Sequence, residues 1–334
     1  MTGETLLAVR DLKVHFPLQG GMFGGKGSVV RAVDGVDFEL KQGETLGIVG
    51  ESGCGKSTLA RAVLRLIPHA AGEVVWLGKD LHALDAEAMR AERRNMQIIF
   101  QDPLASLDPH MSIGAIIGQP LRTFHRELSR QDQRRRVFEA MRQVGLAPEL
   151  ADRFPHEFSG GMCQRVGIAR AMILKPKLVV CDEPVSALDV SIQAQIINLL
   201  MDLQRRFDLS LLFISHNLSV VRHISHRVMV LYLGKVMEIA ERDEFYARPL
   251  HPYSEALISA VPIPDPLLER QRPRIVLSGD LPSPINPPSG CRFSSRCPRA
   301  TEICHKAEPA LLDYGRDHRA ACHHIPITPV ATPR

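Results

Sequence analysis

Aromatic residues are scarce in this chain of 334 residues: they make up 5% of it, with a single tryptophan. A folded core must therefore depend on Leu, Ile, Val and Ala. No apolar run approaches the roughly 20 residues that a membrane span needs, and the first residues lack the apolar core of a signal peptide. Both absences favour a cytosolic protein. The net charge of +4 is small for this length and gives no argument for nucleic-acid binding.

Strands and helices alternate along the first 260 residues. Strands are expected at 6–16, 29–40, 45–50, 72–78, 96–102, 178–184 and 209–216, and helices at 57–67, 85–95, 113–145 and 191–207. Residues 227–240 resemble a hairpin that turns at Leu233–Gly234. This alternation predicts an α/β fold with a mainly parallel sheet, to which the hairpin-like strands add an antiparallel layer.

The composition changes after about Val261. The segment 261–290 is rich in proline and has no sustained period, and four of the seven cysteines lie beyond it. We expect a domain boundary here, between residues 1–260 and a small proline- and cysteine-rich C-terminal domain at 261–334. Residues 17–28 form a second irregular segment, which is expected to be a flexible loop. No internal repeat is present, so the chain carries one copy of its site.

The stretch GESGCGKST at residues 50–58 places three glycines between a buried strand and a helix. It fits the pattern of a phosphate-binding P-loop, G-x-x-x-x-G-K-S/T, in the setting that this loop requires. The backbone N–H groups of residues 53–56 would cradle phosphates at the positive end of the helix. Lys56 would reach the β- and γ-phosphates, and the Ser57 hydroxyl would ligate Mg²⁺. A glycine-rich turn without a ligand is the alternative, which the complete spacing disfavours.

The ATP site predicted from this loop comprises Gly50, Ser52, Gly53, Cys54, Gly55, Lys56, Ser57 and Thr58.

The stretch KLVVCDEPVSALD at residues 177–189 carries two carboxylates at the end of an apolar strand. Asp182 is expected to hold Mg²⁺ through its hydration shell, and Glu183 to polarise the attacking water. A simple strand-ending turn is the alternative. The presence of a P-loop earlier in the sequence favours the catalytic interpretation of these two carboxylates.

The stretch FSGGMCQRVGIARA at residues 158–171 is a third signal. Ser159 is predicted to cap a helix whose first turn holds Gly160 and Gly161. Two glycines in a helix cost about 1 kcal/mol each relative to alanine, and this cost makes sense if a ligand approaches the N–H groups closely. A purely structural turn is the alternative.

The order of these motifs, together with FQDP at 100–103 and FISHN at 213–217, resembles an ABC-type ATPase subunit over about residues 6–260. Four sequence segments are more specifically similar to segments of the ATP-binding subunits of oligopeptide and dipeptide permeases, which are bacterial importers. These segments are FQDPLASLDPHMSIG, CDEPVSALDVSIQAQIINLL, HPYSEALISAVPIPDP and GCRFSSRCPRATEICHKAEP. The resemblance implies ATP hydrolysis coupled to import of peptides, although near relatives import nickel, opines or sugars.

The resemblance also implies roles for single residues. Gln101 resembles the residue that touches Mg²⁺ and senses the permease, and His216 resembles the switch histidine that contacts the γ-phosphate; both join Glu183 in catalysis. Phe16, at the end of the first strand, resembles the aromatic residue that stacks on adenine. A simple core phenylalanine is the alternative there.

Two further sets would act across a subunit interface. The signature within a helical subdomain at about 102–172 would face the ATP of the partner, and it comprises Ser159, Gly160, Gly161 and Met162. The loop that crosses to the second subunit would comprise Ser186, Ala187, Leu188 and Asp189. The usual signature has glutamine at the position of Met162, and because methionine donates no hydrogen bond, this half of the site is expected to be weaker but not inactive.

The C-terminal domain expected at 261–334, called the tail below, has four cysteines, Cys291, Cys297, Cys304 and Cys322. They are separated by five, six and seventeen residues. Zinc ribbons usually show C-x-x-C pairs, which are absent, and the spacing differs from common ferredoxin patterns. Spacing alone supports metal ligands and free thiols equally. Because the tail of some relatives of this type binds a 4Fe–4S cluster, the resemblance favours a cluster. Zinc is the alternative, since several histidines share the region: His305, His318, His323 and His324.

The remaining thiols, Cys54, Cys163 and Cys181, lie inside the ATPase motifs and are expected to pack or to contact nucleotide. In the cytosol they would stay reduced.

The chain has one P-loop and one signature, whereas ABC ATPases hold each ATP between the P-loop of one subunit and the signature of another. The resemblance therefore implies a dimer, with a heterodimer of two different ATP-binding subunits as the leading expectation. Two transmembrane permease subunits would insert helices beside Gln101 and residues 102–114, and a solute-binding protein would complete the complex. The chain would lie peripherally at the cytoplasmic face of the inner (plasma) membrane.

Two other classes share part of the pattern. A soluble ABC ATPase that acts on DNA or ribosomes usually has two cassettes in one chain or a long coiled coil between motifs, and neither is present. A regulatory iron–sulfur or zinc protein would explain the tail but not an intact nucleotide site. No nucleic-acid partner is expected.

Overall fold

The computed structural model describes residues 4–18, 29–262, 265, 270, 274–280 and 282–326. Most of the loop expected at 17–28 therefore lies outside the described residues. The chain divides into two compact units. The first unit comprises residues 1–4, 41–44 and 83–214, and the second comprises residues 5–40, 45–82 and 215–334.

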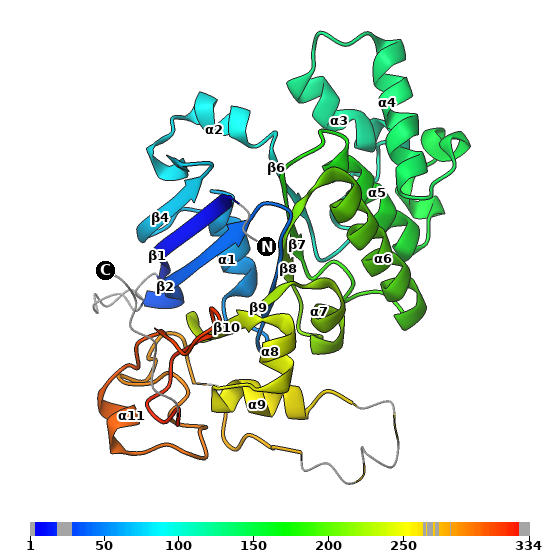
Figure 1. Ribbon diagram of the computed structural model, residues 1–334. Coiled ribbons are helices and arrows are strands. Elements are labelled where there is room, and N and C mark those ends of the chain that lie inside the picture. The colour runs from blue at the N-terminus through cyan, green and yellow to red at the C-terminus, as the bar shows by residue number, and fades with distance from the viewer. Residues whose placement is uncertain are drawn as a thin grey trace. The chain divides into compact units, whose positions relative to one another are not determined.

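The second unit contains an antiparallel sheet in the order β2-β1-β4-β5 (Figure 1). Its strands are β1 (Thr5–Pro17), β2 (Val29–Lys41), β4 (Ala71–Trp76) and β5 (Lys79–Asp80). In β2, the buried residues Val36, Phe38 and Leu40 alternate with exposed Asp37 and Glu39, as a strand with one buried face requires. The antiparallel layer expected from the sequence is confirmed.

Five more strands of the second unit follow the order β11-β12-β10-β9-β3. They are β3 (Thr45–Val49), β9 (Arg227–Tyr232), β10 (Lys235–Glu241), β11 (Leu312–Asp313) and β12 (Arg319–Ala320). Strands β3 and β9 pair in parallel, and β9 and β10 pair antiparallel, so this part of the sheet is mixed. The predicted hairpin turn is confirmed, because Leu233 and Gly234 both have positive φ, of 44° and 74°.

The helices that the structure describes in the second unit are short. They are α1 (Lys56–Val63), α7 (Leu218–Ile224), α8 (Arg242–Ala247), α9 (Pro252–Ser259) and α11 (Glu302–Lys306). A 3₁₀ helix, Leu81–Ala83, stands at the junction of the units in the sequence.

The first unit is built on three parallel strands in the order β6-β7-β8, comprising Met96–Ile99, Leu178–Asp182 and Ser210–Ile214. All five residues of β7 and all five of β8 are buried, which explains why four of the five residues in each strand are apolar. Helix α6 (Val190–Phe207) forms the crossover between these two strands. The predicted parallel α/β arrangement is confirmed here.

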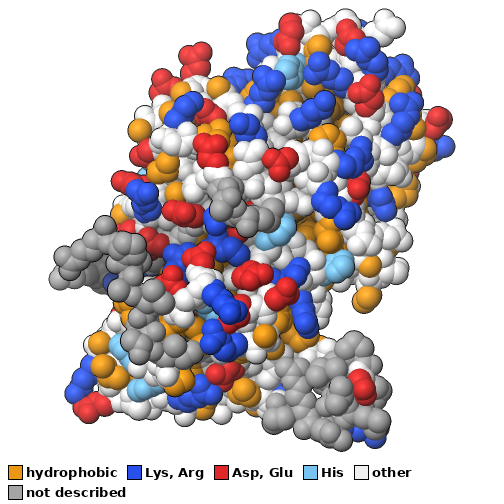
Figure 2. Space-filling view, in the orientation of Figure 1, with side chains coloured by type: hydrophobic (Ala, Val, Ile, Leu, Met, Phe, Trp, Pro, Cys, Tyr) orange, Lys and Arg blue, Asp and Glu red, His pale blue; other side chains and the backbone are white. Residues whose placement is uncertain are grey.

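The other helices of the first unit are α2 (Ala86–Glu92), α3 (Ile113–Phe124), α4 (Arg130–Gln143) and α5 (Gly160–Met172), with 3₁₀ turns at Pro148–Asp152 and Pro155–Glu157. Helices α3, α4 and α5 pack against one another (Figure 1). Figure 2 shows Lys and Arg side chains among Asp and Glu over this helical region, which therefore presents a polar face to solvent. Among the described residues, no helix has both the length and the apolar character that crossing a bilayer requires.

Candidate nucleotide-binding site

The P-loop leaves strand β3 at Val49 and enters helix α1 at Lys56. Gly55, the residue before the helix, has a φ of 106°, and a Cβ there would lie 2.1 Å from the Ala32 carbonyl oxygen. A side chain at this position would therefore push the loop off β2. Ser52 and Gly53 are exposed, so the tip of the loop offers its backbone to a ligand.

The Lys56 side chain lies inside this loop. It is 5% exposed, and its ammonium donates hydrogen bonds to the Gly50 carbonyl at 2.8 Å and the Glu51 carbonyl at 3.0 Å. The cation is thus held beside the N-terminus of α1, where an anion would be stabilised. Ser57 and Thr58 follow in the first helical turn and are half-buried.

The paired carboxylates end strand β7 in the first unit. Asp182 is 2% exposed, whereas Glu183 is half-buried and has a φ of 48°, which is unusual for a residue with a side chain. Gln101, which follows β6, donates from Nε2 to Glu183 Oε2 at 3.3 Å across 82 residues of sequence. The carboxyl ends of two neighbouring strands thus bring together two of the predicted catalytic residues.

The loop after Glu183 folds back on itself. The Ser186 hydroxyl donates to the Glu183 carbonyl at 3.1 Å. Asp189 caps helix α6 by accepting from the N–H groups of Ser191 and Ile192 at 3.1 and 3.0 Å. The hydrogen bond from the Ser191 hydroxyl, followed by these backbone bonds, lowers the pKa of Asp189. Asp189 therefore has a helix-capping role within the chain, which the sequence reasoning had not assigned.

The signature helix begins as predicted. Ser159 is the N-cap of α5 and accepts from the Met162 N–H at 3.3 Å. Gly161 has a packing reason that the sequence did not reveal, because a Cβ there would lie 2.5 Å from Ile192 Cγ2 of α6. At Gly160 a Cβ would make only an ordinary contact with Leu188, at 3.5 Å. Close packing against Ile192 therefore explains why residue 161 is glycine, without the approach of a ligand.

Two other predicted residues belong to the second unit. His216 lies two residues after the end of strand β8 in the sequence and is exposed. The next residue, Asn217, caps helix α7. Phe16, near the end of β1, is 39% exposed and so is not a core residue.

Two of the tail cysteines, Cys291 and Cys304, contact each other through their backbones. The Cys291 N–H donates to the Cys304 carbonyl at 2.8 Å, and Cys304 Sγ lies 3.4 Å from His324 Nε2. Burial, with a contribution from the other three tail thiols, raises the pKa of Cys291 to about 11. All seven cysteines are free. Within the part of the chain that the structure describes, no group of three or more His, Cys, Asp or Glu residues is arranged to hold a metal ion.

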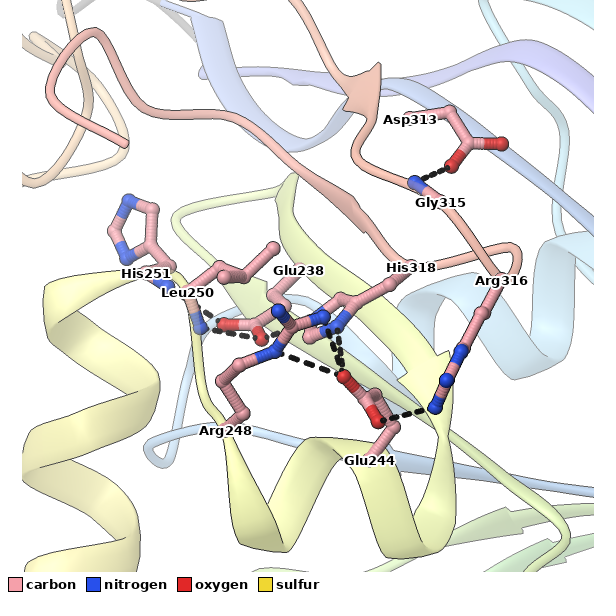
Figure 3. Close-up of polar contacts among 9 residues, drawn as sticks. All are labelled: Glu238, Glu244, Arg248, Leu250, His251, Asp313, Gly315, Arg316 and His318. Carbon is pink, nitrogen blue, oxygen red and sulfur yellow. Dashed lines mark hydrogen bonds and ion pairs between the residues drawn. The ribbon is translucent and has the colours of Figure 1, made fainter. Parts of the chain in front are cut away.

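A buried carboxylate in β10 connects the tail to the body of the second unit (Figure 3). Glu238 accepts from the N–H groups of Leu250 and His251 at 2.9 and 2.8 Å, and it lies 2.7 Å from His318 Nε2. The side chains of Glu238 and His318 are both fully buried. Burial lowers the pKa of His251 to about 4, so this imidazole stays neutral and its Nδ1 accepts from the Tyr253 N–H at 3.0 Å.

The P-loop, the carboxylates that end β7 and the capped signature helix are together the parts of an ATP-binding cassette. The family model for the ABC transporter matches residues 33–186. An ATP-binding cassette solved as a dimer in a post-hydrolysis state with ADP and phosphate is similar over 71% of this chain and 98% of its own, with a TM-score of 0.63 and 26% identity. The chain is therefore an ABC transporter ATPase.

A second family model, for the C-terminal region of oligopeptide/dipeptide transporters, matches residues 237–304. The oligopeptide transport ATP-binding protein OppF of Salmonella typhimurium is 58% identical over 96% of both chains. The di/tripeptide transport ATP-binding protein DppF of Pseudomonas aeruginosa is 49% identical over 96% of this chain and 98% of its own. The chain belongs to the family of ATP-binding subunits of oligopeptide and dipeptide ABC transporters.

Proposed function

We propose that the chain hydrolyses ATP to drive the import of di- or oligopeptides. The observation that carries this proposal is the P-loop, in which the buried Lys56 ammonium lies against two loop carbonyls at the start of α1. The match of residues 237–304 to a peptide-transporter region supports a peptide as the substrate. Nickel, opines and sugars are the alternatives.

The predicted residues receive roles in this proposal. ATP binds Phe16, Gly50, Ser52, Gly53, Cys54, Gly55, Lys56, Ser57 and Thr58. Ser57, Gln101 and Asp182 would hold Mg²⁺, Asp182 through the hydration shell of the ion, because hydroxyl, amide and carboxylate oxygens suit this ion. When bound, Mg²⁺ would neutralise charge that develops on the phosphates. Glu183 and His216, with Gln101, direct water onto the γ-phosphate. The exposed position of His216 and the contact of Gln101 with Glu183 support these roles.

The site is completed by a second subunit. Residues 159–162 and 186–189 of one subunit face the ATP on the P-loop of the other, and the exposure of Ser159, Ala187 and Asp189 supports this arrangement. The partner is a different ATP-binding subunit. Two transmembrane permeases and a solute-binding protein complete the importer, and the chain lies peripherally at the cytoplasmic face of the membrane.

The domain boundaries follow the change in composition. Residues 1–260 form the ATP-binding domain, with a helical signature subdomain at about 102–172, and residues 261–334 form the C-terminal domain. The packing of α3, α4 and α5 against one another supports the subdomain.

Peptide import has a direct test. When the chain is assembled with its permeases in lipid vesicles and its solute-binding protein is added, di- and oligopeptides should raise the rate of phosphate release by about tenfold, because the permease couples ligand arrival to dimer closure with a free energy of a few kcal/mol. The same vesicles tested with nickel, an opine or a sugar are the controls. Stimulation by one of these, and not by peptides, would reassign the substrate.

The tail is proposed to hold one 4Fe–4S cluster on Cys291, Cys297, Cys304 and Cys322. Four thiols match the ligand count of such a cluster. The hydrogen bond from the Cys291 N–H to the Cys304 carbonyl, at 2.8 Å, supports the proximity of two of these residues. His324, which lies 3.4 Å from Cys304 Sγ, keeps zinc as the alternative.

Metal analysis distinguishes these possibilities. Protein purified without oxygen after iron-replete growth should be brown and contain about four irons per chain. Serine at any of the four tail positions should bleach it, whereas serine at the buried Cys163 should not. One zinc per chain without iron would establish the zinc alternative, and absence of both metals would leave the cysteines as ordinary thiols.

A further inference from the structure

Glu51, the second residue of the P-loop motif, has a partner for each of its polar groups. Its carbonyl accepts from Lys56 at 3.0 Å. Its N–H donates to the Tyr253 hydroxyl at 3.0 Å, and its carboxylate accepts from Arg296 at 2.8 Å. Two of these partners, Tyr253 and Arg296, come from the C-terminal region that the second family model matches, residues 237–304, and lie 202 and 245 residues further along the chain. All four residues belong to the second unit.

Arg296 is held firmly by its own segment. Its side chain is 10% exposed. Phe293, three residues earlier, is fully buried, with its ring centroid 5.4 Å from that of Tyr232 and 5.3 Å from that of Tyr253. Arg292 forms a buried ion pair with Asp34 of β2. An arginine anchored in this way loses little conformational freedom when it binds a carboxylate, so its charge is fixed beside the P-loop.

Tyr253 is also held by a chain of hydrogen bonds that runs from Glu238 through His251. Glu238 accepts from the N–H of His251 (Figure 3). The His251 imidazole in turn accepts from the Tyr253 N–H. The Tyr253 side chain is fully buried, and burial raises the pKa of its hydroxyl, which therefore stays neutral. The motif HPY at residues 251–253 thus has a structural role. Its histidine is the N-cap of α9, and the hydroxyl of its tyrosine accepts from the N–H of Glu51 in the P-loop.

We propose that Arg296 and Tyr253 are positioning residues of the ATP site, through which the C-terminal region sets the affinity for nucleotide. Arg296 neutralises a carboxylate that would otherwise repel the phosphates of ATP and compete with them for Lys56. Tyr253 fixes the Glu51 peptide, and with it the direction of the loop that follows. This inference rests on the proposed ATP site, but it concerns binding affinity and not transport.

The test compares Arg296 with Arg299, which lies in the same segment but pairs with Glu255 of α9, at 3.0 and 2.7 Å. Titration calorimetry of the full chain with Mg·ATP should show a Kd about tenfold higher for Arg296→Ala, in keeping with the loss of one charge-assisted hydrogen bond. Arg296→Lys should restore most of the affinity. Arg299→Ala should bind as the unaltered chain does. In the assembled complex, Arg296→Ala should raise KM for ATP by a similar factor and change kcat by less than about twofold.

A second comparison shows whether Arg296 acts through Glu51. In a Glu51→Gln background, Arg296→Ala should change Kd by less than about twofold, because the charge that Arg296 neutralises is gone. Tyr253→Phe, which keeps the ring, should raise Kd by about threefold. The inference is overturned if Arg296→Ala binds ATP as the unaltered chain does, or if it loses the same factor in both backgrounds. Normal Mg·ATP binding without peptide-stimulated hydrolysis would overturn the proposed function instead.

Discussion

Replacement of Glu183 by glutamine is expected to leave ATP binding intact and to lower ATP turnover in the assembled complex by about 100-fold or more, the usual contribution of a general base. Glu183 stands at the carboxyl end of β7, directly after the buried Asp182. Glutamine keeps the size of the side chain and an oxygen that can accept from Gln101, but its amide polarises water poorly. The loss should therefore fall on kcat, with Kd for ATP within about twofold of its original value.

Glu241→Gln is a matched control, because Glu241 is an exposed carboxylate that also ends a strand, β10. Phosphate release and equilibrium ATP binding should be measured on both variants, and the Glu183 variant should accumulate as a closed, ATP-bound dimer. Near-normal turnover in the Glu183→Gln complex would remove this residue from the catalytic role.

Replacement of Ser159 by arginine is expected to reduce hydrolysis by about 100-fold while ATP binding at the P-loop of the same chain stays within about twofold. Ser159 is exposed at the N-terminus of α5. If it faces the phosphates of the partner's ATP, a long side chain there keeps the two subunits from closing. The change also removes a helix cap, which costs about 1 kcal/mol of stability.

Ser129 provides the control for this second effect. It caps α4 by accepting from the Asp132 N–H at 3.1 Å and is exposed, so Ser129→Arg carries the same loss of a cap without touching the signature. Its complex should hydrolyse ATP normally. Equal loss in both variants would mean that the effect comes from helix stability, and high activity of a proven monomer would contradict the shared site altogether.

Local patterns in the sequence predicted what depends on neighbouring residues. The P-loop between β3 and α1, the cap at Ser159 and the hairpin turn at Leu233–Gly234 all follow from short-range chemistry, and the structure confirms each. The buried strands β7 and β8 were likewise recognisable, because a strand covered on both faces is apolar throughout.

Contacts between distant segments could not be predicted in this way. The packing of Gly161 against Ile192 depends on how α5 and α6 meet, and no local pattern reports that. The pairing of Glu51 with Arg296 spans 245 residues, and in the sequence Arg296 is one basic residue among many. The two-residue strands β11 and β12 were missed because so short a segment has no period to detect.

The Glu238–His318 contact has a consequence for the order in which the protein matures. Residue 318 is added 80 residues after residue 238, which at translation rates of 5–20 residues per second is a delay of about 4 to 16 s. During that interval the carboxylate of β10 can accept from the N–H groups of Leu250 and His251 but lacks its imidazole partner, and burying it without that partner would be costly. The edge of the sheet at β10 is therefore completed only after Arg319 and Ala320 of β12, which pair with β10, have been added to the chain.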